Sequence, residues 1–129
     1  ELSDASKESA KDVPNEMIRK IAANKDFNIF YGAPTIIIVS GKEENAMPGV
    51  DCAAATQNML IAAESLDIGV CWNGLVGLLF NNEVIFEKYI KKLQIPQGFK
   101  PYYAIALGYK EVRMSNAPAR RENTVQYIR

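Results

Sequence analysis

The sequence predicts a domain of mixed helices and strands in the order helix, strand, helix, strand, helix, strand, followed by a polar tail. Three segments carry this prediction. Residues 51–66 have helical length and almost no polar face, which indicates a helix covered on several sides. Thr35–Ser40 is a continuous, mostly β-branched run, typical of a central strand covered on both faces. Tyr102–Leu107 is a further apolar strand that ends at Gly108.

The composition suits one domain with a substantial core, because 48% of the 129 residues are hydrophobic. No run approaches the roughly 18 apolar residues that a membrane span requires, and the first residues show neither a signal pattern nor a transit pattern. We therefore expect a cytoplasmic protein that makes no membrane contact.

Local signals predict the remaining helices. Residues 3–24 are expected to be helical with an interruption near Pro14, because proline cannot donate a helical hydrogen bond but suits the first turn of a new helix. Asp51 is the expected N-cap of the buried helix. Asn81 or Asn82 is expected to cap a later helix, in which acidic residues come first and lysines come last, the order that complements the helix dipole.

The end of the chain is expected to behave differently from the rest. Residues 1–109 form the predicted core, and residues 110–129 form an extension that has no core of its own. Residues 123–128 have strand-like composition but no following segment with which to pair. Adding a strand to the sheet edge of a second subunit would satisfy this segment.

Charge is distributed unevenly along the chain. The formal net charge is zero, yet residues 1–86 carry −6 and residues 87–129 carry +6. The basic part lacks the interleaved aromatic residues of a nucleic-acid-binding surface, so nucleic acid is not the expected partner. A positive tail that binds a phosphate group, or a partner's acidic surface, fits this pattern better.

The absence of histidine narrows the possible chemistry. It excludes Ser-His-Asp and Cys-His catalysis and histidine-ligated zinc within this chain. Cys52 and Cys71 lack the spacing of a zinc site or a disulfide framework, and both are expected to be buried, reduced thiols. No metal site and no catalytic side chain is therefore predicted. A cofactor that brings its own chemistry remains the simplest source of catalysis.

A short turn is the first candidate for binding a ligand. Val70–Trp72 is the expected strand after the buried helix, and Trp72-Asn73-Gly74 follows as a turn whose backbone amides could face a flat ligand. The residues alone fit an ordinary Asn-Gly turn equally well.

Four segments together resemble the FMN-dependent nitroreductase family, especially its small members. They are GAPTIIIVS, DCAAATQNMLIAAESLDIGVCWNGL, IPQGFKPYYAIALGYK and APARRENTVQYI, in this order. The resemblance implies an α+β fold, a three-layer α/β/α sandwich with a central mixed sheet, built as an intertwined homodimer with one FMN at each end of the subunit interface. In this family a reduced nicotinamide, NADH or NADPH, passes electrons to the flavin, which passes them to a small-molecule acceptor such as a nitroaromatic compound or a quinone.

The resemblance also implies which residues contact the cofactor. Asn73 and Gly74 match the segment that brings backbone N–H groups to the N5 edge of the flavin, and Cys71 and Trp72 lead into it. A donor at this place would orient the ring and stabilise its reduced form. Trp72 could stack on the ring, although an aromatic residue in an apolar strand more often belongs to the core.

Contacts are also expected for two further pairs of residues. Arg120 and Arg121 match basic residues that reach the FMN phosphate, which an arginine can bind through two parallel hydrogen bonds, and a solvated charge pair is the alternative. Gln57 and Asn58 are polar exceptions on the predicted buried helix, so we expect their amides to find partners across the subunit boundary.

The sequence departs from the family pattern at its start. Family members begin with an arginine-rich segment that binds the flavin phosphate, and this chain begins at Glu1 without it. We expect truncation or an incomplete sequence rather than a natural variant. The alternatives are a cofactor-free or inactive binding module on the same scaffold, and another flavin reaction such as dehalogenation or dehydrogenation.

Overall fold

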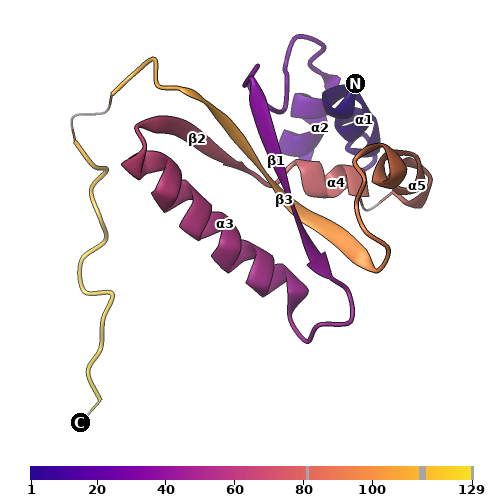
Figure 1. Ribbon diagram of the computed structural model, residues 1–129. Helices are drawn as coiled ribbons and strands as arrows, with labels where there is room; N and C mark the ends of the chain where they lie inside the picture. Colours follow the sequence, from indigo (N-terminus) through magenta and orange to yellow (C-terminus); the bar gives the residue numbers. More distant parts are fainter. Residues whose placement is uncertain (81, 114–115, 129) are drawn as a thin grey trace.

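The computed structural model describes residues 1–80, 82–113 and 116–128 (Figure 1). The elements are α1 Leu2–Ser9, α2 Glu16–Ala23, β1 Thr35–Lys42, α3 Pro48–Ser65, β2 Ile68–Asn73, α4 Val76–Phe80, α5 Glu83–Lys92 and β3 Phe99–Tyr109. Helix α3 lies along one face of the sheet, and the other helices gather against the opposite face (Figure 1). The predicted α+β class and three-layer arrangement are confirmed.

The sheet has three strands in the order β1-β3-β2, and both pairings are antiparallel. Two expectations are therefore wrong for the chain by itself. The run at Thr35–Ser40 lies in an edge strand, where Ile37 is 37% exposed, and no parallel pair makes the sheet mixed among the described strands. Strand β3 takes the central place because Ala104 and Ile105, neighbours on opposite faces, are both fully buried.

Helix α3 begins three residues earlier than its expected cap. Pro48 occupies the first turn, where its missing N–H is not needed, and Met47 is the N-cap residue. Asp51 therefore lies inside the first turn, and the prediction that it caps the helix is wrong. Its carboxylate still lies near the positive end of the helix dipole.

Only one face of α3 is covered. Cys52, Thr56 and Ala63 are its buried residues, and all three face the sheet side of the helix. Val50 and Ile61, by contrast, are 62% and 60% exposed. The expectation of burial on several sides is wrong for the single chain, which leaves an apolar helix face uncovered.

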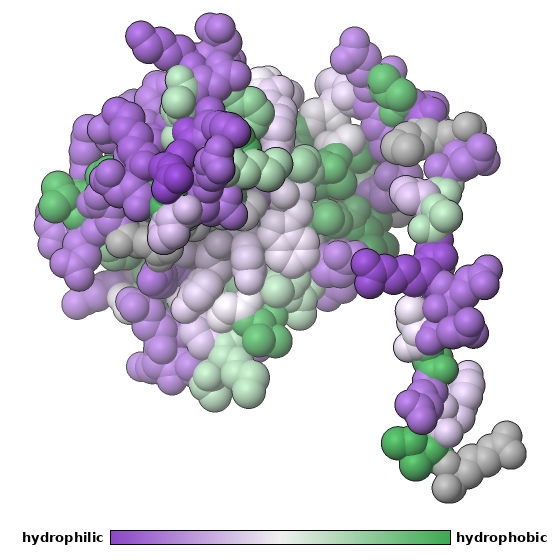
Figure 2. Space-filling view, turned by 180° about the vertical axis from the view of Figure 1, so that it is seen from behind, coloured by the Kyte–Doolittle hydropathy of each residue, from purple (hydrophilic) through white to green (hydrophobic). Residues whose placement is uncertain are grey.

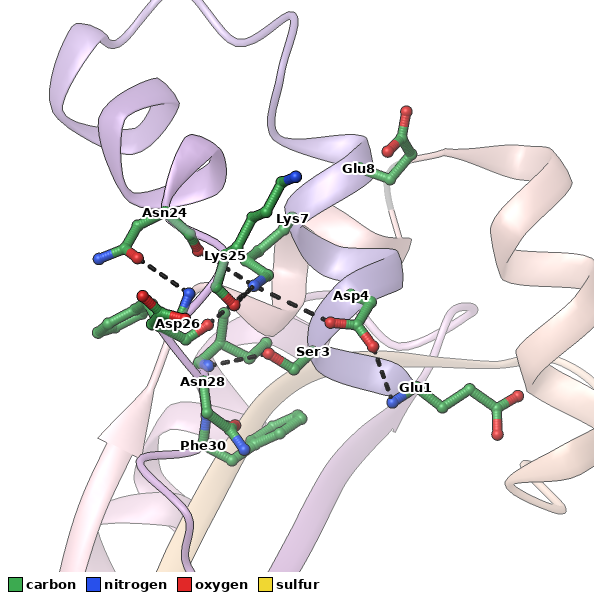
Figure 3. A network of polar contacts seen from close by, with 12 residues as sticks. Glu1, Ser3, Asp4, Lys7, Glu8, Asn24, Lys25, Asp26, Asn28 and Phe30 are labelled. Carbon is green, nitrogen blue, oxygen red and sulfur yellow. Dashed lines mark hydrogen bonds and ion pairs between the residues drawn. The ribbon is translucent and has the colours of Figure 1, made fainter.

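The first two helices and the loop after them are joined by polar contacts (Figure 3). The predicted interruption is confirmed, and Asn15 caps α2 through its side-chain oxygen. Lys7 donates hydrogen bonds of 3.0–3.2 Å to the backbone carbonyls of Asn24, Lys25 and Phe27, while only 11% of its side chain is exposed. One ammonium group thus satisfies three carbonyls of the loop and fixes the approach to β1.

Two hydrophobic clusters lie on the two faces of the sheet. One includes Ile29, Val76 and Ala104, and the other contains Val39, Cys52 and Ile105. Asn82 caps α5 as expected, since its side-chain oxygen accepts from the Ile85 amide at 3.2 Å; Asn81, the alternative cap, lies outside the described residues. Helix α4 was not predicted. No helix of the described ranges is long and apolar enough to cross a membrane.

The tail leaves the domain through an ionic cluster. Lys110 lies 2.8 Å from a carboxylate oxygen of Glu64 and 3.3 Å from one of Asp67, and Arg113 pairs with the other oxygen of Asp67. Lys110 and Arg113 hold the pKa of Asp67 below its usual range, and the two carboxylates raise the pKa of Lys110.

Beyond this cluster, the described tail residues 116–128 form no helix or strand and stand away from the body of the domain (Figure 2). The strand expected at residues 123–128 is therefore not formed within the single chain. The division between a core of residues 1–109 and an extension of residues 110–129 stays a prediction.

Candidate functional site

A hollow of about 410 Å³ lies at the end of the sheet where β1 and β2 begin and β3 ends. This volume falls within the range of about 300–1,000 Å³ that is usual for small-molecule sites. Its lining includes Tyr31, Gly32, Cys71, Ala106, Gly108 and Glu111.

Small residues bring backbone to the floor of this hollow. A Cβ atom at Gly69 would lie 3.1 Å from the carbonyl oxygen of Gly108, and one at Gly108 would lie 3.3 Å from the ring of Pro34. Both strands therefore need glycine at these positions to approach so closely. The result is a shallow floor on which a flat molecule could contact main-chain atoms.

Cys71 lies on this floor with its side chain exposed, so the expectation of a buried thiol is wrong for this residue. Its neighbour across the sheet is Ala106, whose methyl group is too small to cover the sulfur. The thiol donates to the carbonyl of Trp72 at 3.7 Å. Cys52 is buried as predicted, and burial raises the pKa of its thiol.

Trp72 belongs to the other side of the sheet. Successive residues of a strand point to opposite faces, so Trp72 points away from the hollow that contains Cys71. Its ring packs edge-on against Tyr103, with centroids 5.0 Å apart and planes at 78°. This contact gives Trp72 a packing role in the hydrophobic layer beneath α3.

The turn at Asn73 and Gly74 is fixed by the buried Asn73 side chain, while Gly74 itself is exposed. Asn73 is 2% exposed; its side-chain oxygen accepts from the Val76 amide at 3.2 Å, and its amide group donates to the carbonyl of Ile29. The side chain is therefore fully used in capping α4 and joining it to the preceding loop. Gly74 is exposed, and a Cβ atom there would meet nothing within 4 Å.

The two arginines and the two amides are not brought to the hollow within one chain. Arg120 and Arg121 are exposed residues of the tail, which extends away from the domain (Figure 1). Gln57 and Asn58 are exposed on α3 in the single chain, and their expected partners across the subunit boundary stay a prediction. Across the described ranges, no group of three Cys, Asp or Glu side chains could hold a metal ion.

Tyr31 is the wall residue that sequence analysis missed. It is 57% exposed and lies in the left-handed region with φ of 58°, followed by Gly32 with φ of 72°. Partial burial and the neighbouring Cys71 raise the pKa of its hydroxyl. The sequence Tyr-Gly-Ala-Pro signals a turn, but nothing local shows that this turn lies beside Cys71, 40 residues later.

The architecture and this hollow define an α+β domain with a surface suited to a flat ligand. Residues 1–109 match the sequence profile of the nitroreductase family, and the chain belongs to that family.

Relatives with assigned names are consistent with this membership. A protein of Methanothermobacter thermautotrophicus, provisionally named an NADH dehydrogenase/NAD(P)H nitroreductase, is 34% identical over 99 residues, which are 73% of this chain and 50% of that protein. A Bacillus subtilis protein named FMN reductase (NADPH) is 35% identical over 81 residues, which are 58% of this chain and 30% of that protein. The chain thus spans half or less of the length of these two relatives.

Solved structures show the same fold. A Bacteroides fragilis nitroreductase with bound FMN superposes with a TM-score of 0.85 at 29% identity, covering 99% of this chain and 68% of that one. A Desulfitobacterium hafniense nitroreductase superposes with a TM-score of 0.84 at 22% identity, covering 99% of this chain and 68% of that one. The predicted family resemblance is confirmed.

Proposed function

We propose that this chain is part of an FMN-dependent oxidoreductase that takes hydride from NADH or NADPH and reduces a nitroaromatic compound, a quinone or a related acceptor. The observation that carries the proposal is the open hollow lined by Gly69 and Cys71 of β2, with the exposed Gly74 directly after that strand, in a chain of the nitroreductase family. The names of the relatives include FMN and NADH or NADPH, which supports FMN as the cofactor and a reduced nicotinamide as the electron donor.

The proposed flavin ring lies along β2 from Cys71 to Gly74. A strand rises about 3.3 Å per residue, so these residues span about 10 Å, which suits the long axis of a three-ring system. Nothing covers Gly74, so the ring edge can approach the backbone there. The buried Asn73 side chain keeps the turn in place, which would hold a backbone N–H donor ready for the N5 edge of the ring.

Bound FMN would supply the redox chemistry by accepting a hydride and passing electrons to the acceptor. The residues present fit a site in which the cofactor supplies the chemistry and the protein supplies binding. The hollow offers backbone, small side chains, the Cys71 thiol and the Tyr31 hydroxyl, and the chain has no histidine that could act as a base. The protein's part is to bind and orient the ring, and we assign no residue as nucleophile or general base.

We further propose that a second copy covers the exposed face of α3. Val50, Ile61 and Leu66 are 60–70% exposed along this helix, and Ala54 and Ala62 would allow a close approach. A contiguous exposed apolar face of this kind marks an interaction surface. In the dimer the tail can reach the other subunit.

The same dimer accounts for the two arginines. Arg120 and Arg121 lie far from the hollow of their own chain, and a tail that reaches the other subunit could bring one of them to the phosphate of its FMN. A guanidinium group can donate two parallel N–H hydrogen bonds to such a phosphate.

The test uses the protein as its gene encodes it. We expect a yellow protein that binds FMN more tightly than riboflavin, which lacks the phosphate, and that oxidises NADH or NADPH when a nitroaromatic compound or quinone is present. One of the two variants R120A and R121A, the one that removes the arginine at the phosphate, should weaken FMN binding and leave riboflavin binding unchanged. The matched control, R19A on α2, should change neither. A full-length protein that binds neither flavin would refute the proposal and favour a cofactor-free module.

A further inference from the structure

We propose that the loop between α2 and β1 contains a receptor for a primary ammonium ion, and that Lys7 of α1 fills it. Three backbone carbonyls, those of Asn24, Lys25 and Phe27, form the receptor. By filling it, Lys7 positions two segments that border the proposed flavin site, the wall formed by residues 31–34 and the turn after β2. This positioning role rests on the proposed function, whereas the receptor itself does not.

The first argument is the match between donors and acceptors. An ammonium group has three N–H donors and no acceptor. The Lys7 nitrogen lies 3.0–3.2 Å from the three carbonyl oxygens, so each donor has one acceptor. A carboxylate oxygen of Asp4 is 3.9 Å away, beyond hydrogen-bond distance, and the Asp4 side chain is 75% exposed. The loop, rather than an ion pair within α1, therefore holds the ammonium group (Figure 3).

The second argument is burial. Only 11% of the Lys7 side chain is exposed, and lysine is almost never buried without partners. Moving an ammonium group out of water is costly unless its hydrogen bonds are replaced. Three carbonyl oxygens that point at one place in turn repel one another unless a positive charge lies between them. The ammonium group and the loop conformation thus depend on each other.

The third argument is the connection between this loop and the turn after β2. Ser3 lies one helical turn before Lys7 on the same face of α1, and its hydroxyl oxygen accepts from the Ile29 amide at 3.1 Å. Ile29 is 2% exposed, and its carbonyl accepts from the side-chain amide of Asn73. Helix α1 therefore holds the loop at two places, and Ile29 connects the loop to the turn.

The same loop continues into the wall of the hollow. The Tyr31 amide donates to the Asn28 carbonyl at 2.8 Å, and the Ala33 amide donates to the Phe30 carbonyl at 3.0 Å. Residues 31–34 follow as part of the lining of the hollow. A shift of the loop would therefore displace two borders of the site together, and small misplacements of binding groups are enough to weaken a site.

The first experiment tests the receptor by chemical rescue. K7A removes three carbons and the ammonium group, which n-propylammonium would replace. This ion should raise the melting temperature of K7A relative to its effect on wild type. At equal concentration, 1-propanol, which lacks the charge, and tetramethylammonium, which lacks N–H donors, should not. A melting temperature of K7A that n-propylammonium leaves unchanged would overturn the receptor.

Two further variants test whether Lys7 acts through its N–H donors or only by filling space. Methionine has a similarly long, unbranched side chain without donors, whereas arginine keeps both the charge and the donors. K7R should therefore melt at a higher temperature than K7M, and the reverse order would count against the receptor. The matched control is K20A, because Lys20 lies on α2 in an exposed ion pair with Glu16 at 2.8 Å. n-Propylammonium should not stabilise K20A.

The second experiment measures FMN binding by the full-length protein, well below the melting transition, so that only folded molecules are compared. K7A should raise the dissociation constant of FMN about tenfold, because this constant rises as the binding-competent arrangement becomes less populated. n-Propylammonium should restore most of the lost affinity, and K20A should bind as wild type does. A K7A variant that melts earlier but binds FMN like wild type would overturn the positioning role. Wild-type protein that binds no FMN would refute the proposed function and the positioning role with it, while the rescue of melting still decides the receptor.

Discussion

Replacing Asn73 by alanine tests whether the turn before α4 is held as the structure indicates. The Asn73 side chain bridges two buried groups, the carbonyl of Ile29 and the amide of Val76, which are separated by 47 residues in the sequence. Ile29 is 2% exposed and Val76 is fully buried, so water cannot replace the lost partner. N73A therefore leaves one donor and one acceptor unsatisfied inside the core.

The size of the effect follows from those two groups. An unsatisfied buried polar group costs about 1–3 kcal/mol, so we expect N73A to lower the free energy of unfolding by about 3 kcal/mol. Asn82 provides a matched control, because it caps α5 with the same type of contact at 3.2 Å but is exposed. N82A should lower the free energy of unfolding by only about 1 kcal/mol.

Urea unfolding at one fixed protein concentration measures both variants. A loss in N73A no larger than that in N82A would refute the assigned role. The N73D variant tests the same contact through the direction in which its stability changes with pH. A protonated carboxyl can donate to the Ile29 carbonyl and an ionised one cannot, so its folded pKa is raised. Its contribution to stability should be present below about pH 4, the unfolded pKa, and disappear as the pH rises through the folded pKa.

Four other substitutions test separate features. Ser6 is buried with a hydroxyl that has no hydrogen-bond partner, so S6A should raise the free energy of unfolding by about 1 kcal/mol; a decrease in urea unfolding would contradict this. K7M removes the three bonds to the loop and should cost about 2 kcal/mol in the same assay, while an unchanged midpoint would show that the loop is held otherwise. G41A places a Cβ atom 2.8 Å from the Cys52 sulfur and should lower the melting temperature, whereas G74A should not, and equal shifts would disprove this packing argument. Because its partners lower the pKa of Asp67, the advantage of wild type over D67N should exist above about pH 4 and vanish as the pH falls through the folded pKa; a difference that persists in acid would speak against the ionic cluster.

Local signals were enough to predict most of the elements. Pro14 separates α1 from α2, and Asn82 caps α5, because both residues act on the few backbone groups next to them. The β-branched run after Pro34 forms a strand for the same reason. Such effects depend on sequence neighbours and need no knowledge of the fold.

Errors arose wherever a distant segment decides the outcome. The exposure of Cys71 could not be inferred from its apolar sequence neighbours, because it depends on the small Ala106 across the sheet. Tyr31 was overlooked for the same reason, since its contact with Cys71 joins segments that only the fold brings together. Of the predicted residues Cys71, Trp72, Asn73 and Gly74, only Cys71 lines the hollow, and the wall that the distant residues 31–34 contribute could not be predicted.

The predicted burial of α3 on several sides failed for a different reason. The apolar composition of the helix was recognised, but the single chain does not contain the segments that would cover it. The segment has almost no polar face, yet Val50, Ile61 and Leu66 remain 60–70% exposed in the single chain. A sequence selected in an assembly carries the pattern of the assembled state, so a helix buried between two subunits looks like a core helix. If the proposed homodimer forms, the expected burial on several sides is restored by the second copy, and the free strand-like tail gains a sheet edge on which to pair. The uncovered helix face and the unpaired tail are then two parts of one interface, and a protein that stays monomeric at micromolar concentration would count against both.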